Sequence, residues 1–267
     1  MLPNDANCIL LSVTELSRMA RLEILYIHPT EFELAIFQTI NGYAGVNWAL
    51  DRVANMLIHN NLIKHGLFIA SFWVLWLNAT SDQIRRRADL CFILVAVSLS
   101  LFVNQVISSI FPMRSRPIYW TDIGLREPTF DISHFRRMLE TFSSFPSDHA
   151  AIYFALTAGF WFISRRLAVA MAIWSVVCLL ARIFMGLHFP SDIFIGATIA
   201  IVVTVAARRE ALLRFLRTCV DYLETHAATL FHAAVFLFVF QIGNLFWESR
   251  LLAASVVKVV KRIFDLA

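Results

Sequence analysis

Residues 167–207 decide the fold and read LAVAMAIWSVVCLLARIFMGLHFPSDIFIGATIAIVVTVAA. The two apolar runs in this stretch, 167–185 and 190–207, each approach the roughly 20 residues that a helix needs to cross about 30 Å of hydrocarbon. The stretch therefore predicts two membrane helices joined by a short turn. Ionisable groups close to hydrocarbon are candidates for a functional site, and three lie around this turn: Arg182, His188 and Asp192.

The rest of the chain continues the apolar pattern. Of its 267 residues, 59% are hydrophobic and only 16% are charged, against about 25% in soluble domains. Four further apolar runs suit membrane helices, at 61–78, 89–111, 148–164 and 228–247. We therefore expect an all-α fold, a polytopic integral membrane helical bundle of about six transmembrane helices, as one domain over residues 1–267.

The two ends of the chain are expected to lie differently. Residues 1–58 mix apolar positions with charges and with Gly42 and Gly45, which suits an interfacial N-terminal segment or a broken helical hairpin better than a full span. Residues 208–267 are expected to form a C-terminal helical extension. The long polar connection, 111–145, is either a lid that reads a headgroup or a solvated link.

The net charge of +4 predicts orientation rather than nucleic-acid binding, because the basic residues gather beside apolar runs. By the positive-inside rule three clusters are cytoplasmic: Arg85, Arg86 and Arg87; Arg165 and Arg166; and Arg208, Arg209, Arg214 and Arg217. The opposite helix ends, with Arg116, His149 and His188, then meet on one outer face. The expected partners are a lipid bilayer and a membrane lipid substrate, and the oligomeric state stays open.

Two helix starts on that face carry histidines. Asp192 follows His188 by four positions and can reach back to one imidazole nitrogen, which leaves the other as a nucleophile. In Pro-Ser-Asp-His at 146–149, Ser147 can cap a helix whose first N–H groups form an anion site, and His149 can act as general acid. Structural capping is the alternative interpretation of each pattern.

Arginines complete the constellation. Arg116 and Arg182 supply fork-shaped donors that suit phosphate oxygens, and Arg114 is a further candidate. A single arginine at a helix end is more often an anchor at the membrane interface. Two histidines, a carboxylate and at least two arginines on one face together predict a phosphate site.

The order Arg-Pro at 116–117, Pro-Ser-x-His at 146–149 and Arg-x5-His-x3-Asp at 182–192 resembles the signature of the type 2 phosphatidic acid phosphatase (PAP2) superfamily. The resemblance covers residues 89–207 as a catalytic core. It implies a metal-independent mechanism with no cofactor, in which His188 forms a phosphohistidine, Asp192 orients it and His149 protonates the leaving group. The phosphate-binding candidates are Arg116, Arg182, Ser147, Asp148 and Arg114.

The chain departs from this signature at three positions. Ser109 stands where the family usually has a lysine, Ala181 where it has a serine, and Asp148 where it has a glycine. Arg114 is the candidate replacement for the missing lysine. The Asp148 carboxylate suits a helix N-terminus, but it repels a phosphate unless it points away or is paired.

The wording Ser-Phe-Pro-Ser-Asp-His at 144–149 resembles the bacitracin-resistance branch of that superfamily. This resemblance implies a lipid phosphatase acting on a polyprenyl diphosphate such as undecaprenyl diphosphate, on the outer face of a bacterial inner membrane. Three alternatives stay open. They are a phosphotransferase that uses a lipid or sugar acceptor, a phosphatase for phosphatidic acid or phosphatidylglycerol phosphate, and a non-catalytic phospholipid-binding protein.

Overall fold

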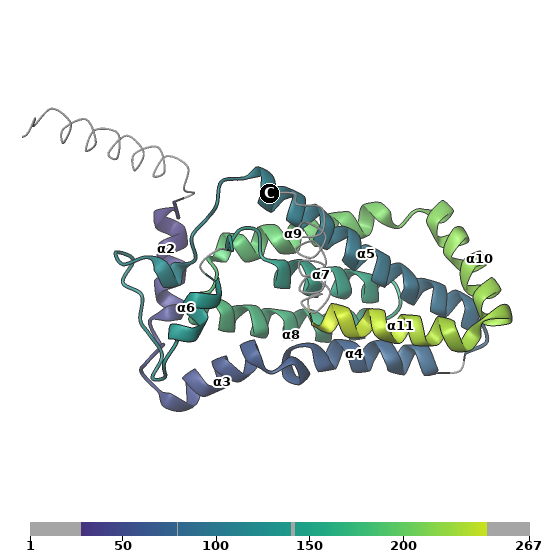
Figure 1. Cartoon of the computed structure of the whole chain (residues 1–267), viewed down its shortest axis with the longest axis horizontal. Helices are drawn as coiled ribbons and strands as arrows, with labels where there is room; N and C mark the ends of the chain where they lie inside the picture. The colour runs from purple at the N-terminus through teal and green to yellow at the C-terminus, as the bar shows by residue number, and fades with distance from the viewer. Residues whose placement is uncertain (1–27, 79, 140–141, 245–267) are drawn as a thin grey trace, which may run out of the picture.

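The computed structural model describes residues 28–78, 80–139 and 142–244, and every regular element in those ranges is helical (Figure 1). The apolar runs form α4 (Asn61–Leu77), α5 (Gln83–Ile110), α7 (Asp148–Trp161), α8 (Arg165–Phe184), α9 (Pro190–Ala207) and α11 (Ala228–Gly243). The other elements are α2 (Glu31–Asn41), α3 (Trp48–His59), the 3-10 turn η1 (Pro117–Tyr119), α6 (Ser133–Leu139) and α10 (Glu210–His226). The expected all-α bundle is confirmed.

Short polar side chains set where most of the core helices begin. Asn60, Asp82, Ser147 and Ser164 are N-caps, and the side-chain oxygen of each accepts a hydrogen bond from a first-turn N–H. These bonds satisfy donors that are costly to leave unpaired near hydrocarbon. Among these residues, Asn60 and Ser147 fix the starts of α4 and α7.

The central helix of the bundle is α7, which packs against α5, α8 and α9. Two glycines permit this close packing. A Cβ on Gly159 would lie 2.7 Å from the side chain of Ile93 in α5, and a Cβ on Gly196 in α9 would lie 2.5 Å from the carbonyl oxygen of Ser147. Small residues let helix backbones approach, so the start of α7 lies directly against α9.

Three helices are long and apolar enough to cross a membrane, namely α5, α8 and α9. The expected spans at 61–78, 148–164 and 228–247 form shorter helices of 17, 14 and 16 residues. At about 1.5 Å per residue, 14 residues cover only about 21 Å. Three of the six expected spans therefore have the full length and composition within the described residues. α4 and α11 are shorter apolar helices, and α7 ends at Trp161, before Ser164 caps α8.

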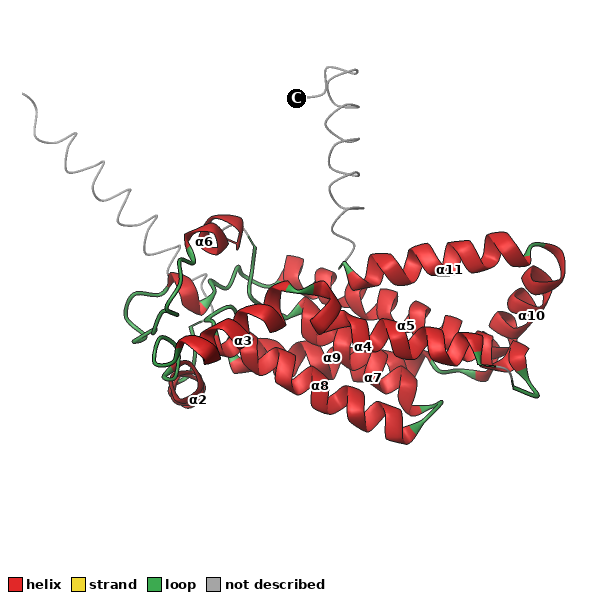
Figure 2. Ribbon diagram, turned by 90° about the horizontal axis from the view of Figure 1, so that it is seen from below, coloured by secondary structure: helices red, strands yellow, loops and turns green. Residues whose placement is uncertain are grey.

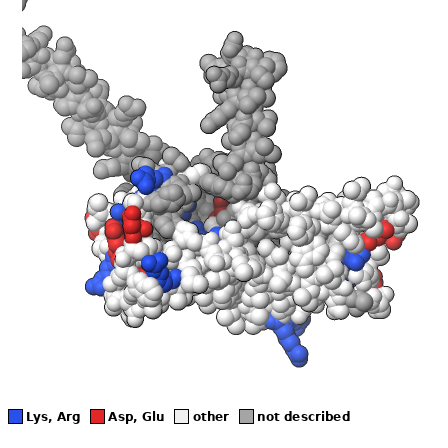
Figure 3. Space-filling view, turned by 60° about the horizontal axis from the view of Figure 1, so that its bottom comes forward, with Lys and Arg blue, Asp and Glu red and all other residues white. Residues whose placement is uncertain are grey.

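The surface agrees with a membrane protein. Figure 3 shows a largely uncharged face, with charged side chains gathered at its two ends and a basic group projecting from its lower edge. Large apolar side chains are exposed along the spanning helices, among them Phe102, Val106, Ile173, Leu180, Phe194 and Val202. Extended exposed apolar surface marks contact with lipid or with a partner.

The N-terminal helices and the polar connection cover one end of the bundle (Figure 2). α2 and α3 each pack on α8, and the turn between them contains Gly45 at φ +72°. The Asp51 carboxylate accepts a hydrogen bond from the Thr129 N–H at 2.8 Å, and the Ile118 N–H donates to the Gly186 carbonyl at 2.9 Å. The connection is therefore an ordered cover. The expected interfacial residues 1–27 lie outside the described residues.

The helices expected after residue 208 are present as α10 and α11. α10 packs on α5 and α11 packs on α4, and Arg87 of α5 forms an ion pair with Glu224 of α10 at 2.6 Å. Residues 245–267 of the expected extension lie outside the described residues.

Candidate active site

Three stretches of the sequence, 116–117, 146–149 and 182–192, meet at one end of the bundle. Nη1 of Arg116 lies 3.1 Å from Nε2 of His188, and the N–H of Ser147 donates to the carbonyl of Asp192 at 3.0 Å. His149 follows in the first turn of α7, so it lies at the same end. These contacts join the first and the second stretch to the third.

His188 lies in the turn between α8 and α9, where Gly186 adopts φ +69°. The residue is buried, and its Nδ1 is 2.9 Å from the carbonyl oxygen of Ser144. Because a carbonyl only accepts, Nδ1 carries the hydrogen and Nε2 carries the lone pair. Burial, followed by the nearby charge of Arg116, lowers the pKa of His188 to about 4. At neutral pH the ring is uncharged and Nε2 has its lone pair available.

Asp192 is fully buried in the first turn of α9. Its Oδ2 accepts a hydrogen bond from the Phe189 N–H at 2.8 Å and lies 3.7 Å from Nδ1 of His188. The contact with His188 that the sequence predicts is therefore electrostatic at this distance. The direct hydrogen bond to the ring comes from the backbone carbonyl of Ser144, which side-chain patterns in a sequence do not reveal.

Arg114, a candidate phosphate ligand by sequence, has both terminal nitrogens on carboxylates. Its Nη1 lies 2.6 Å from Oδ1 of Asp192, and its Nη2 lies 2.7 Å from Oε2 of Glu33. The guanidinium also lies over the Phe189 ring, 4.5 Å from its centroid. Arg114 therefore holds the carboxylates of Asp192 and Glu33. Its terminal nitrogens are not free to bind phosphate in place of the lysine that is absent at Ser109.

Glu33 is a site residue that the sequence reasoning missed. It lies in α2, outside the three stretches, and Oε1 accepts a hydrogen bond from the Ser191 N–H at 3.1 Å and another from the Ser191 hydroxyl. An acidic residue in a first helical turn is common and gives no signal of a distant partner. Glu33 and Arg114 connect α2 to Asp192.

Arg116 holds the backbone around the nucleophile. Its Nη1 donates to the Leu187 carbonyl at 2.8 Å, and its Nη2 donates to the Ser143 carbonyl at 3.2 Å. Burial lowers the pKa of Arg116, an effect that the Asp192 carboxylate opposes, and an arginine remains charged. A cation therefore lies beside Nε2 of His188.

Arg182 lies in the last turn of α8 and is only 8% exposed. Its side chain forms no hydrogen bond or ion pair with any residue that the structure describes, and its Nε is buried without an acceptor. Its charge acts on both His149 and His188. Because a buried cation without a counter-charge is costly, this guanidinium is suited to bind an anion.

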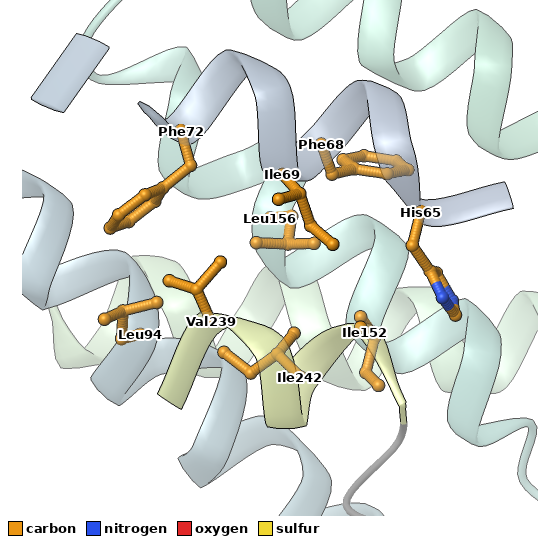
Figure 4. Close-up of a pocket in the computed structure, with 10 residues that line it drawn as sticks. His65, Phe68, Ile69, Phe72, Leu94, Ile152, Leu156, Val239 and Ile242 are labelled. Carbon is orange, nitrogen blue, oxygen red and sulfur yellow. The ribbon is translucent and has the colours of Figure 1, made fainter. Parts of the chain in front are cut away.

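His149 is half-buried and lies against the start of α4. Its ring is stacked with His65 at a centroid distance of 6.3 Å and meets Tyr153 edge-on at 6.1 Å. A small apolar cavity of about 20 Å³ begins beside this pair, and Figure 4 shows His65 at one end of it. Its lining includes Phe68, Ile152, Leu156, Val239 and Ile242. The cavity is too small for a lipid chain, but its lining shows that His65 lies against apolar side chains.

The remaining predicted ligands lie at the start of α7. The hydroxyl of Ser147 accepts a hydrogen bond from the Ala150 N–H at 3.4 Å. The Asp148 carboxylate accepts hydrogen bonds from Asn104 Nδ2 at 2.7 Å and Gln105 Nε2 at 2.9 Å, both on α5. Side-chain amides of α5 thus hold the Asp148 carboxylate. It is therefore not directed at a phosphate, which it would repel.

The groups that gather here are cations and imidazoles. Among the described residues, no three His, Cys, Asp or Glu side chains come together in a group that could hold a metal ion. The arginines match phosphate oxygens, and the histidines match the roles of nucleophile and acid. The arrangement is chemically suited to binding a phosphoryl group and transferring it.

Comparison with known proteins identifies a family over the same part of the chain. Residues 89–213 match the family model of the PAP2 superfamily, a range that contains all three stretches. Undecaprenyl-diphosphatase BcrC of Bacillus subtilis is 22% identical over 168 residues, which cover 63% of this chain and 78% of the relative. No solved structure matches the chain.

Two further relatives are similar over shorter regions. Phosphatidylglycerophosphatase B of Haemophilus influenzae is 31% identical over 83 residues, which cover 27% of this chain and 34% of the relative. Lipid A 1-diphosphate synthase of Escherichia coli is 28% identical over 152 residues, which cover 54% and 58%. The relatives are thus named for reactions of different phosphorylated lipids.

Proposed function

We propose, from the premise that residues 89–213 belong to the PAP2 superfamily, that this chain is a membrane lipid phosphatase working through a phosphohistidine on His188. The observation that carries the proposal is the orientation of His188. Its Nδ1 is held by the Ser144 carbonyl, and its Nε2 faces Arg116. A neutral imidazole with one nitrogen free beside a cation suits attack on phosphorus.

In the first step, Nε2 of His188 forms a bond to phosphorus while the bond from phosphorus to the leaving oxygen breaks. The leaving oxygen keeps that electron pair and takes a proton from His149. Burial and Arg182 keep His149 uncharged before the substrate binds, so it takes up this proton from solvent when the phosphate anion binds beside it. Arg116 exchanges its contact with Nε2 for a phosphate oxygen, and Arg182 binds another. Asp192, with Oδ2 3.7 Å from Nδ1, stabilises the positive charge that the ring acquires.

In the second step, water attacks the phosphohistidine. His149, now neutral, accepts a proton from the water, and the electron pair of the nitrogen–phosphorus bond returns to Nε2. The products are phosphate and the dephosphorylated lipid. This route uses only side chains and requires no metal ion or cofactor.

The proposed substrate is a polyprenyl diphosphate such as undecaprenyl diphosphate. Two observations support it: the Ser-Phe-Pro-Ser-Asp-His wording at 144–149 and the relative named as an undecaprenyl-diphosphatase. The arginine clusters at the opposite helix ends support a bacterial inner membrane location with the site on its outer face.

The test is phosphate release by the purified full-length protein from undecaprenyl diphosphate, phosphatidylglycerol phosphate and phosphatidic acid, with and without EDTA. We expect the fastest release from the diphosphate, unchanged by EDTA, and a phosphorylated protein intermediate. His188→Ala should abolish release, whereas His226→Ala on the exposed face of α10 should not. Equal release by His188→Ala protein contradicts the mechanism, and faster release from another lipid contradicts the substrate.

Phosphate transfer to an acceptor is the second candidate. The similarity to a lipid A 1-diphosphate synthase favours it, since that name describes the making of a lipid diphosphate. With labelled undecaprenyl diphosphate and lipid or sugar acceptors present, label moving to an acceptor supports transfer, and label appearing only in free phosphate supports hydrolysis. Tight lipid binding without either product supports a non-catalytic phospholipid-binding protein.

A further inference from the structure

Lys64 is a buried cation in the first turn of α4, outside the range that matches the superfamily. It is 8% exposed, and its Nζ donates to the carbonyl of Ile58, in the last turn of α3, at 3.1 Å. An ammonium group has three N–H donors, so two remain beyond this bond. Lys64 forms no ion pair with any carboxylate of the described residues.

The charges of Lys64 and Arg182 both act on His149. α4, which carries Lys64, is in contact with α8, which carries Arg182, and the two positive charges disfavour each other and the charged form of His149. Asp148, whose charge reaches Arg182, is held by Asn104 and Gln105 on α5. Two buried cations that share a region without an ion-paired carboxylate are stabilised when an anion binds between them.

The position of Lys64 also indicates whether it lies nearer the nucleophile or nearer the leaving group. Arg116 lies against His188, whereas Lys64 directly precedes His65, whose ring is stacked with His149. Lys64 and His65 share the first turns of α4, the helix that reaches the proposed general acid, so we assign Lys64 to the side of the leaving group. In a lipid diphosphate, the leaving group is the phosphate that stays on the lipid. In a lipid monophosphate it is an alcohol, which carries no charge for Lys64 to bind.

We propose that Lys64, together with Arg182, binds the phosphate that a lipid diphosphate retains after cleavage, and so selects diphosphates over monophosphates. This inference rests on the proposed function. It also provides a cation from α4 at a site where Ser109 supplies none, because Ser109 is exposed on α5 and its hydroxyl donates to the Val106 carbonyl. α4 thus adds specificity to a core built by α5, α7, α8 and α9.

The test compares Lys64→Met with wild type on undecaprenyl diphosphate and phosphatidic acid. We expect kcat/KM for the diphosphate to fall about 10- to 100-fold, as for loss of a hydrogen bond to a charged group, and kcat/KM for the monophosphate to change less than about threefold. Arg166→Met, at an exposed position at the start of α8, is the matched loss of a positive charge and should change neither. Equal losses on both lipids, or no loss on the diphosphate, overturn the proposal.

A binding measurement separates this inference from the proposed function. In His188→Ala protein, calorimetric affinity for undecaprenyl diphosphate should fall about 10- to 100-fold when Lys64→Met is added. If wild type releases no phosphate but this loss of affinity is seen, the proposed function fails and the role of Lys64 stands. If the affinity is unchanged, the inference fails whatever the activity. Lys64→Gln serves as a second neutral variant should the Met variant not fold.

Discussion

Arg114 and Asp192 form a buried ion pair, with 2.6 Å between Nη1 and Oδ1 and with 2% and 0% of the two side chains exposed. Glu33 binds the other terminal nitrogen of the same guanidinium, so two carboxylates share one cation. The pair fixes Oδ1 of Asp192 and leaves Oδ2 facing His188. The nucleophile is thus positioned through a chain of contacts that begins in α2.

Arg114→Met should damage both stability and catalysis. Removing one partner of a buried pair leaves an uncompensated charge and costs about 3–5 kcal/mol of unfolding free energy. We also expect kcat to fall at least about tenfold with a smaller change in KM, because Asp192 no longer holds its place beside His188. Glu33→Gln should have a weaker effect on both, since Arg114 keeps Asp192. Wild-type kcat in Arg114→Met protein contradicts this positioning role.

Arg182→Met should separate stability from phosphate binding. Arg182 has no ion-pair partner among the described residues, so its removal leaves no carboxylate unpaired, and the thermal unfolding midpoint should stay equal or rise. Vanadate, a phosphate analogue, should inhibit the variant about 10- to 100-fold less tightly. A fall in the unfolding midpoint like that of Arg114→Met, with vanadate inhibition unchanged, would assign Arg182 a structural role instead.

The pH dependence should report the neutral state of His188. Its pKa is lowered to about 4 by burial and by Arg116, from an ordinary value near 6.5. A lowered pKa means that the unfolded chain binds the proton more readily, so this contribution to stability is complete above pH ~6.5 and is lost as the pH falls toward ~4. The acid limb of kcat/KM should therefore lie nearer 4 than 6.5.

The control for this prediction is the unfolding midpoint of His188→Asn protein. Between pH ~6.5 and ~4 it should fall less than that of wild type, because the residue that gains a proton on unfolding is absent. An acid limb at the ordinary histidine value contradicts the buried, neutral imidazole.

The chemistry of the leaving group should identify His149. A general acid contributes about 10²- to 10⁴-fold when the leaving oxygen is a poor one, and much less when it leaves readily as an anion. His149→Ala should therefore lose about 10² or more in kcat on phosphatidic acid, whose leaving group is an alkoxide, but far less on an aryl phosphate. Equal losses on both substrates contradict the role of proton donor.

The sequence predicted those parts of the site that depend on helix order and local spacing. The alternation of apolar runs with arginine clusters placed Arg116, His149 and His188 at one end, and the contact between Arg116 and His188 agrees. The four-residue spacing placed Asp192 near His188, but the hydrogen bond to the ring comes from the Ser144 carbonyl. Backbone groups carry no residue-specific signal, so spacing alone does not reveal them.

Two residues outside the three stretches, Glu33 and Lys64, were not predicted, and the two cases differ. Glu33 reaches the site through a tertiary contact between α2 and α9, which no local pattern encodes. Lys64 did carry a signal, because a lysine in an apolar run is costly unless it has a function. The start of α4 at Asn61 was predicted correctly, whereas the span at 148–164 was predicted three residues too long, because α7 ends at Trp161 before Ser164 caps α8.

Gly196→Ala should disturb the site without touching any of its side chains. The added Cβ would lie 2.5 Å from the carbonyl oxygen of Ser147, so α7 and α9 must move apart. That movement strains the hydrogen bond from the Ser147 N–H to the Asp192 carbonyl and shifts His149 away from His188. We expect about 1–3 kcal/mol of destabilisation from overpacking and a fall in kcat of about 10- to 100-fold from misplacement.

Gly66→Ala on α4 is the matched control, because its Cβ would meet only the flexible Leu62 side chain at 3.1 Å, so wild-type kcat and equal or higher stability are expected. If both variants keep wild-type kcat, the close approach of α7 to α9 does not position the two histidines.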